Sequence, residues 1–272
     1  MGRISSSHSG FCKCDLRHSF LAAPAGKNGI ITYNISKIGE FNAMTTLNLD
    51  HDEGTIMALK LTPNALISAY ESGSICKWGE TSVIAHTQVE GMPTCIEFSF
   101  LSGEVLLGTS TDQVHILDQD LRPKRQVQLR NGGLNCLSIR HDGRIYASSG
   151  WDHRLRVFSA KSHKSLCVLE LHDESLNCLA FGQTLLASGS SDALISLWNL
   201  YNWFQRMIAG VCVQPTVLNE IGCPWRPLWR IPFKDCSSRI TKYLCTYGTS
   251  GSNFVQIWSS VVSLTTACPE PV

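Results

Sequence analysis

The 272-residue sequence predicts an all-β protein, a β-propeller with about five blades that do not complete a ring. Three observations predict this fold. Apolar and polar residues alternate along short segments, as on half-buried strands. These segments come in pairs around a turn of small residues, and each pair ends in a bulky side chain. The pairs recur about every 40 residues, a period typical of propeller blades.

The first unit is predicted over residues 11–49. It contains FLAAPAGKNGIITYNI, in which two apolar stretches flank a glycine-containing turn and Tyr33 takes the bulky position. We interpret this unit as a degenerate copy of the units that follow it.

The next four units are predicted over residues 50–80, 81–120, 121–160 and 161–201. Their aligned segments are NALISAYESGSICKWGE, EVLLGTSTDQVHILDQD, GRIYASSGWDHRLRVFSA and TLLASGSSDALISLWNLY, with Trp78, Leu117, Phe158 and Trp198 at spacings of 39, 41 and 40. An alternating strand precedes each segment, and a further strand, such as SVIAH at 82–86 or SLCVLEL at 165–171, precedes that one. We therefore expect each unit to form one four-stranded blade. Five such units fall short of the roughly 280 residues of a seven-bladed ring.

The two ends depart from the repeat. Residues 1–10 are polar, and residues 202–272 hold four of the seven Trp, five of the twelve Cys and six of the ten Pro. The tail carries a net charge of +3, against −2 for the rest of the chain. We predict an atypical N-terminus and an atypical C-terminal tail. The sequence leaves open whether the tail forms an extra blade or is a splice or gene-model variant.

Composition excludes several classes of partner and of chemistry. A net charge of +1 provides no bulk attraction for nucleic acid or an anionic membrane. Neither a secretory signal nor an apolar run of membrane-spanning length is found, so we expect a reduced, cytoplasmic protein, with the nucleus left open as a second compartment. The cysteines lack the close pairs of a zinc site, and no phosphate loop or GxSxG elbow occurs. We therefore expect no metal, no cofactor and no enzymatic activity.

The last unit contains residues that resemble the WD-repeat family. In that family a His, a Ser or Thr, an Asp in the turn and a Trp form a buried hydrogen-bonded relay. The positions in this unit are His172, Ser188, Asp192 and Trp198. The other units fit in part. The unit at 50–80 has His51, Ser68 and Trp78, but Ser72 stands in place of the Asp. The unit at 81–120 has Asp112, but Gly108 and Leu117 stand in place of the Ser and the Trp, and the unit at 121–160 has Ser148, Asp152 and Phe158, but Arg130 or Asn131 lies near the His position. The resemblance implies a structural role for these groups.

The stretch 143–201 narrows the resemblance. SSGWDHRLRVF, LELHDESLNCLAF and GSSDALISLWNLY closely resemble the guanine nucleotide-binding protein subunit beta-like protein 1 family, which is related to ASTRA-associated protein 1. The resemblance weakens toward residue 11, and it implies that two blades of the family precede this region. It further implies a non-catalytic scaffold, a co-chaperone or adaptor in the maturation of phosphatidylinositol 3-kinase-related kinases, working with the Tel2-Tti assembly and Hsp90-linked machinery.

Two alternatives stay open. The shared fold suggests a G-protein beta-like signalling subunit. Trp151 to Arg154 spells a W-D-x-R box, which in ubiquitin-ligase substrate receptors binds an adaptor.

The same resemblance places one residue of each unit on the top rim of the propeller, just before the Asp of the turn. In this chain these residues are Glu71, Thr111, Trp151 and Ser191. A large aromatic side chain at a rim is a candidate interface anchor, so Trp151 is the leading partner-contact residue. Packing of Trp151 against a neighbouring blade is the alternative.

Overall fold

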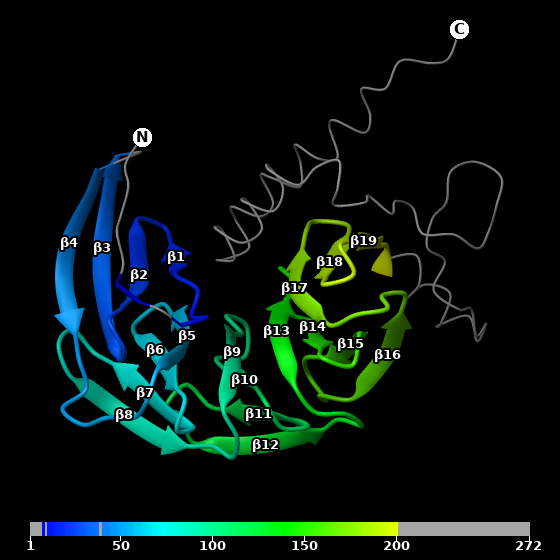
Figure 1. The fold of residues 1–272 in the computed structure, drawn as a ribbon, viewed down its shortest axis with the longest axis horizontal. Helices are drawn as coiled ribbons and strands as arrows, with labels where there is room; N and C mark the ends of the chain where they lie inside the picture. Colours follow the sequence, from blue (N-terminus) through cyan, green and yellow to red (C-terminus); the bar gives the residue numbers. More distant parts are fainter. Residues whose placement is uncertain (1–6, 9, 38–39, 201–272) are drawn as a thin grey trace, which may run out of the picture.

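The computed structural model describes residues 7–8, 10–37 and 40–200, and their regular structure consists of nineteen strands. The strands form five antiparallel sheets, four with four strands and one with three. Figure 1 shows the sheets side by side in an open arc, with one edge strand of each facing the centre and the other on the outside. The prediction of an all-β, incomplete propeller of five blades is confirmed.

The strand bounds follow the predicted order. The first sheet contains β1 (Asp15–Arg17), β2 (Phe20–Ala25), β3 (Gly29–Lys37) and β4 (Glu40–Leu47). The second contains β5 (Ile56–Leu61), β6 (Leu66–Tyr70), β7 (Ser74–Trp78) and β8 (Val83–Gln88). The third contains β9 (Pro93–Phe98), β10 (Val105–Thr109), β11 (Gln113–Leu117) and β12 (Pro123–Gln128). The fourth contains β13 (Leu134–Ile139), β14 (Ile145–Gly150), β15 (Arg154–Ser159) and β16 (Ser165–Glu170). The fifth contains β17 (Leu176–Phe181), β18 (Leu186–Ser190) and β19 (Ile195–Trp198).

The sheets are displaced by one strand from the units that the sequence predicts. SVIAH lies in β8, which pairs with β7 of the preceding sheet, and SLCVLEL contains β16, which pairs with β15. The expectation that each unit forms one blade is therefore wrong. The cause is the short turn between the third strand and the next one, closed by the Gly79 N–H to Ser82 carbonyl bond of 2.9 Å, which forces those two strands into a hairpin.

The core lies between neighbouring sheets. The second strands β6, β10, β14 and β18 are buried along their whole length. β6, β10 and β14 lie in sheets that have a neighbouring sheet on each side, which covers both faces. Between the third and fourth sheets, Leu106 and Ile116 pack against Leu134 and Tyr146. The Tyr146 ring stacks on Phe158 with 4.9 Å between centroids. This packing is a property of the array, because no single sheet has a core of its own.

A buried ionic cluster joins the first three sheets. Lys60 on β5 contacts Glu97 on β9 at 2.7 Å and Asp15 on β1 at 3.9 Å, and Asp15 accepts a 2.8 Å bond from the Leu61 N–H. Burial by itself lowers the pKa of Lys60, but the two carboxylates outweigh it and hold that pKa above its usual value. The three residues lie on β5, β9 and β1, which are the first strands of their sheets.

The predicted boundaries at the ends stay predictions, because residues 1–6 and the tail at 202–272 lie outside the described residues. All seven cysteines of the described part are free thiols. Within that part, no helix is both long and apolar enough to cross a membrane.

Candidate protein-interaction rim

The structure brings the four expected residues of the fifth sheet together. His172 Nδ1 lies 2.8 Å from Asp192, His172 Nε2 lies 3.0 Å from the Ser188 hydroxyl, and the Trp198 indole N–H donates to that hydroxyl at 2.9 Å. A carboxylate only accepts, so Nδ1 carries the proton, and on the neutral ring Ser188 then donates to Nε2. Asp192 also accepts the Leu194 N–H at 2.9 Å, which shapes the turn.

Although this group has the residue types of a hydrolase triad, its place in the fold is structural. Ser188 is 1% exposed and His172 is 4% exposed. The serine hydroxyl is already engaged by both Trp198 and His172. Burial raises the pKa of Asp192, but the bonds from His172 outweigh it and the pKa is lowered. The relay therefore fixes a turn to the core and offers no accessible nucleophile.

The second sheet builds its relay differently. The Trp78 indole N–H donates to Ser68 at 2.7 Å, as expected, but Ser68 then donates to the Tyr70 hydroxyl at 3.2 Å. His51 is not part of this group, because its largely exposed ring contacts Glu53 at 2.9 Å. Ser72 replaces the turn aspartate by bonding the Ser74 N–H at 3.2 Å.

In the fourth sheet an arginine replaces the histidine. Asp152 contacts the buried Arg156 and accepts a 3.0 Å bond from Asn131, the loop residue near the expected His position. Ser148 is fully buried, and its hydroxyl has no hydrogen-bond partner among the described residues. Phe158 has no polar atom to offer it. In the third sheet Asp112 and Leu117 lie at the predicted turn and strand, and no side-chain bond joins them.

The rim residues share one local geometry. Each lies in the turn between the second and third strands, beside the loop that leads into the first strand. Backbone bonds join the two segments, as in Glu71 N–H to Thr55 (2.9 Å), Trp151 N–H to Gly133 (2.9 Å) and Ser191 N–H to Ser175 (3.0 Å). Glu71, Thr111 and Trp151 each lie close over a loop glycine, which is Gly54, Gly91 or Gly133. All three glycines have positive φ, so the sequence spacing of these glycines is the signal that could have found the arrangement.

Trp151 is the large aromatic side chain of this rim. It is 47% exposed, and its indole N–H donates to Asn135 on β13 at 2.7 Å. A Cβ atom at Gly133 would overlap the indole ring, so the ring lies directly against this glycine. Asn135 in turn donates to the Leu176 carbonyl of the fifth sheet at 2.9 Å. Trp151 is thus held on its own sheet, with about half of its surface facing solvent.

The recurring Leu-Asn-Cys-Leu tetrapeptide explains this support. Its asparagines, Asn135 and Asn177, occupy equivalent positions at the top of β13 and β17. Asn135 accepts from Trp151, and Asn177 donates to the Ser191 hydroxyl at 2.8 Å. In the fourth and fifth sheets, one asparagine therefore orients one rim side chain.

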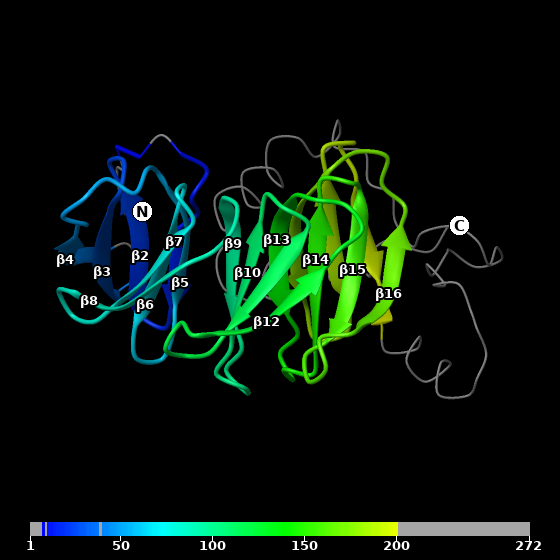
Figure 2. The same ribbon diagram turned by 90° about the horizontal axis from the view of Figure 1, so that it is seen from below.

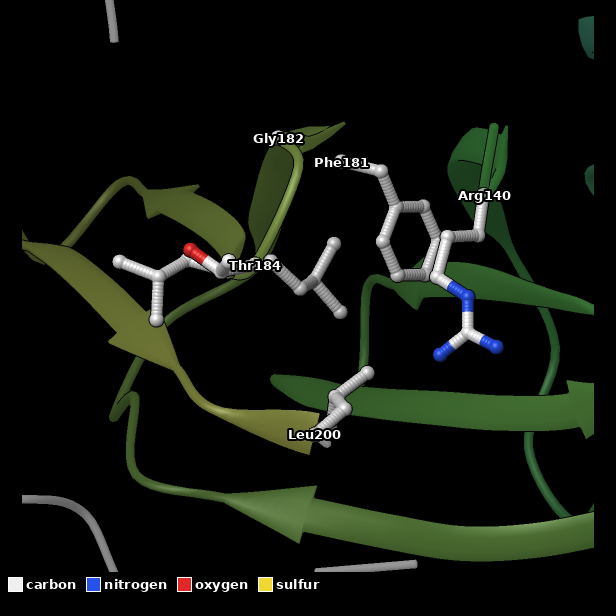
Figure 3. Close-up of a pocket in the computed structure, with 7 residues that line it drawn as sticks. Arg140, Phe181, Gly182, Thr184 and Leu200 are labelled. Atoms are coloured by element: carbon white, nitrogen blue, oxygen red, sulfur yellow. The ribbon is translucent and has the colours of Figure 1, made fainter. Parts of the chain in front are cut away.

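At the opposite end, a small hollow lies between the fourth and fifth sheets (Figure 3). Phe181 lies beside Arg140 with Leu200 across from them, and Arg140 is already bound to Asp142 at 2.6 Å. The hollow is too tight for a water-sized molecule. In the described part of the chain, no group of three or more His, Cys, Asp or Glu side chains is placed to hold a metal ion.

Comparison with known proteins agrees with the relay and the repeat. The family described as WD domain, G-beta repeat matches residues 124–159 and 163–199. The chain contains WD40 repeats. These two matched stretches contain the strands from β12 to β19, and the turns and loops between those strands contain Trp151, His172 and Asp192.

The proteins similar in sequence to this chain that are described here have two names. Guanine nucleotide-binding protein subunit beta-like protein 1 of Mus musculus is 36% identical over 152 residues, which cover 50% of this chain and 44% of that protein. ASTRA-associated protein 1 of Schizosaccharomyces japonicus is 49% identical over 71 residues, covering 25% and 20%. ASTRA-associated protein 1 of Verticillium alfalfae is 24% identical over 216 residues, covering 57% and 53%. The chain thus spans about half or less of these relatives.

A solved structure has a similar fold. The crystal structure of the computationally designed Ika8 protein superimposes with a TM-score of 0.57 at 16% sequence identity. The alignment covers 68% of this chain and 57% of that one, so the likeness concerns the fold alone.

Proposed function

We propose that the chain is a non-catalytic WD-repeat scaffold that binds other proteins through its rim. The observation that carries the proposal is Trp151, a half-exposed aromatic ring held by Asn135 and by the Gly133 backbone. A fixed ring loses little conformational freedom on binding, which is why Trp is frequent among residues that dominate interfaces. Ser191 and Glu71 supply exposed polar groups on the same rim.

The partners belong to the same proposal. The relatives named ASTRA-associated protein 1 support a role in the context of the ASTRA complex. We infer a co-chaperone or adaptor that helps phosphatidylinositol 3-kinase-related kinases to mature, in contact with the Tel2-Tti assembly and Hsp90-linked machinery. The proposed location is the cytoplasm, with the nucleus as a second compartment.

Co-purification tests the proposal. The tagged full chain, Trp151→Ala and Val168→Ala would be compared, because Val168 is a similarly exposed apolar residue (43%) on the outer strand β16. Wild type and Val168→Ala are expected to recover the Tel2-Tti assembly, and Trp151→Ala to recover about tenfold less. Equal recovery by all three would refute the rim. No recovery, while a full-length relative recovers the assembly, would refute the adaptor role.

A second candidate has one observation in its favour, the name of the Mus musculus relative, a G-protein beta-like protein. A signalling subunit of this type would bind a γ subunit, so mixing the full chain with γ and measuring co-elution separates the two candidates. The ubiquitin-ligase alternative loses support, because Arg156 engages Asp152, and Arg154 contacts Glu170 at 2.7 Å. The W-D-x-R box is thus satisfied within its own sheet.

A further inference from the structure

The end of the molecule opposite the rim carries two exposed apolar side chains in one turn. Phe100 is 59% exposed and Leu101 is 74% exposed, both in the turn between β9 and β10. Figure 2 shows this turn at the lower margin of the fold, on the same side as the turn between β13 and β14. Two adjacent exposed apolar side chains of this size make the turn a candidate binding surface.

Contacts from two other sheets hold this turn in place. The Arg17 guanidinium of the first sheet lies over the Phe100 ring, 4.3 Å from its centroid. The buried Phe98 ring meets Phe100 edge to face at 5.1 Å. Leu101 packs on Gly143 of the fourth sheet, where an added Cβ would lie 2.9 Å from the Leu101 Cβ. The apolar pair is therefore presented by a fixed surface that three sheets share.

The charge around the pair is positive. Arg144 is exposed, and among the described residues no ion pair joins its guanidinium to a carboxylate, although its backbone N–H donates to Asp142 at 3.1 Å. Both nearby carboxylates are already engaged: Asp142 accepts 2.9 and 2.6 Å bonds from Arg140, and Glu104 is bound by Lys124 and, at 2.9 Å, by Ser102. Burial raises the pKa of Glu104, but these partners outweigh it and the pKa is lowered, so the carboxylate stays ionised and paired. Arg17 and Arg144 are the charges that remain for a ligand.

We propose that Arg17, Phe100, Leu101 and Arg144 form a docking surface, here called the Phe100 patch, for a short acidic segment of another protein. Its apolar side chains would pack on Phe100 and Leu101, and its Asp or Glu side chains would pair with the two arginines. Charge complementarity decides the occupant. A second copy of this chain meeting the patch symmetrically would bring like charges face to face. The surface is separate from the rim that the proposed function uses.

Peptide binding tests the proposal. The full chain would be titrated against two labelled peptides of about 12 residues with the same Leu and Phe positions, one carrying Glu and the other Lys at the remaining positions. Fluorescence anisotropy is expected to show saturable binding of the Glu peptide and about tenfold weaker binding of the Lys peptide. Equal binding of the two peptides, or no binding of either, would overturn the proposal.

Variants locate the site. Phe100→Ser with Leu101→Ser is expected to weaken binding of the Glu peptide about tenfold or more, and Arg144→Gln to weaken it and reduce its salt dependence. Trp151→Ala, at the other end, should bind as wild type does, so failure of the rim and failure of the patch are distinguishable. Arg144 is exposed, so Arg144→Gln decides the question even where the apolar double variant fails to fold.

Two further results would contradict this assignment. If Arg144→Gln binds as tightly as wild type, or if Trp151→Ala abolishes binding, the Phe100 patch is not the site. Sedimentation of the protein without peptide tests whether a second copy of the chain occupies the patch instead. A dimer that the Phe100→Ser and Leu101→Ser double variant abolishes would assign the patch to a second copy of the chain.

Discussion

Replacing Ser188 by alanine tests whether the relay holds the fifth sheet. The Ser188 hydroxyl accepts from the Trp198 indole at 2.9 Å and contacts His172 Nε2 at 3.0 Å. Both partners are buried, Trp198 at 3% exposure and His172 at 4%. Ser188→Ala leaves two polar atoms without a partner in a place that water does not reach.

The size of the effect follows from those two atoms. A buried polar group left unpaired costs about 1–3 kcal/mol, so the loss for two groups is expected to be about 2–6 kcal/mol. Ser148 supplies the control, because it occupies the equivalent position on β14, is fully buried, and has no hydroxyl partner among the described residues. Ser148→Ala removes no hydrogen bond and is expected to change the free energy of unfolding by about 0–1 kcal/mol, toward greater stability.

Urea unfolding followed by circular dichroism measures both changes. With an m-value of about 2 kcal/mol/M, Ser188→Ala should lower the midpoint by about 1–3 M, and Ser148→Ala should raise it by less than about 0.5 M. An equal shift for both variants would mean that volume, and not hydrogen bonding, sets the cost. A negligible shift for Ser188→Ala would show that the relay does not stabilise the fold.

Three further predictions use the same measurement. Lys60→Met leaves the buried Asp15 and the partly buried Glu97 without their cation and should cost about 3–5 kcal/mol. Adding Glu97→Gln should restore part of this loss, and no loss for Lys60→Met would show that water solvates the cluster. Gly133→Ala combines positive φ with overlap of an indole ring and should cost more than Gly26→Ala, which has positive φ but no neighbour within 4 Å; equal costs would contradict the overlap. Burial lowers the pKa of His163 in the folded protein, so on acidification the imidazole of the unfolded chain is protonated first. The free energy of unfolding is therefore fully present above about pH 6.5 and decreases as the pH falls below that value. His163→Gln should flatten this decline between about pH 7.5 and 5, and an unchanged slope would assign it to other groups.

The sequence predicted the number and order of the sheets because alternation and turns are local properties. The relay of His172, Ser188, Asp192 and Trp198 was also predictable, because its four members lie in the unit that resembles the WD-repeat family. The pairing of β8 with β7 was missed because strand partners are decided by the length of the turn between them, and not by the pattern within either strand.

Interactions between units could not be predicted in the same way. Asp15, Lys60 and Glu97 meet only because the arc places their strands side by side. In the sequence, each of them looks like an ordinary charged residue on a strand. Tyr70 replaced His51 beside Ser68 because a ring two residues along the same strand reaches the hydroxyl. Only the three-dimensional register decides between such competing partners.

Each sheet takes its fourth strand from the next sequence repeat, so neighbouring repeats depend on each other when a repeat is added or removed. β16 is encoded with the unit at 161–201, yet it completes the sheet whose other strands come from 121–160. Deleting the later repeat would therefore uncover the outer edge of its predecessor and expose the backbone groups of β15. A viable duplication, swap or truncation has to cut at the top loops, between the fourth strand of one sheet and the first of the next. The ends of a sequence repeat and the ends of a folded sheet are thus one strand apart.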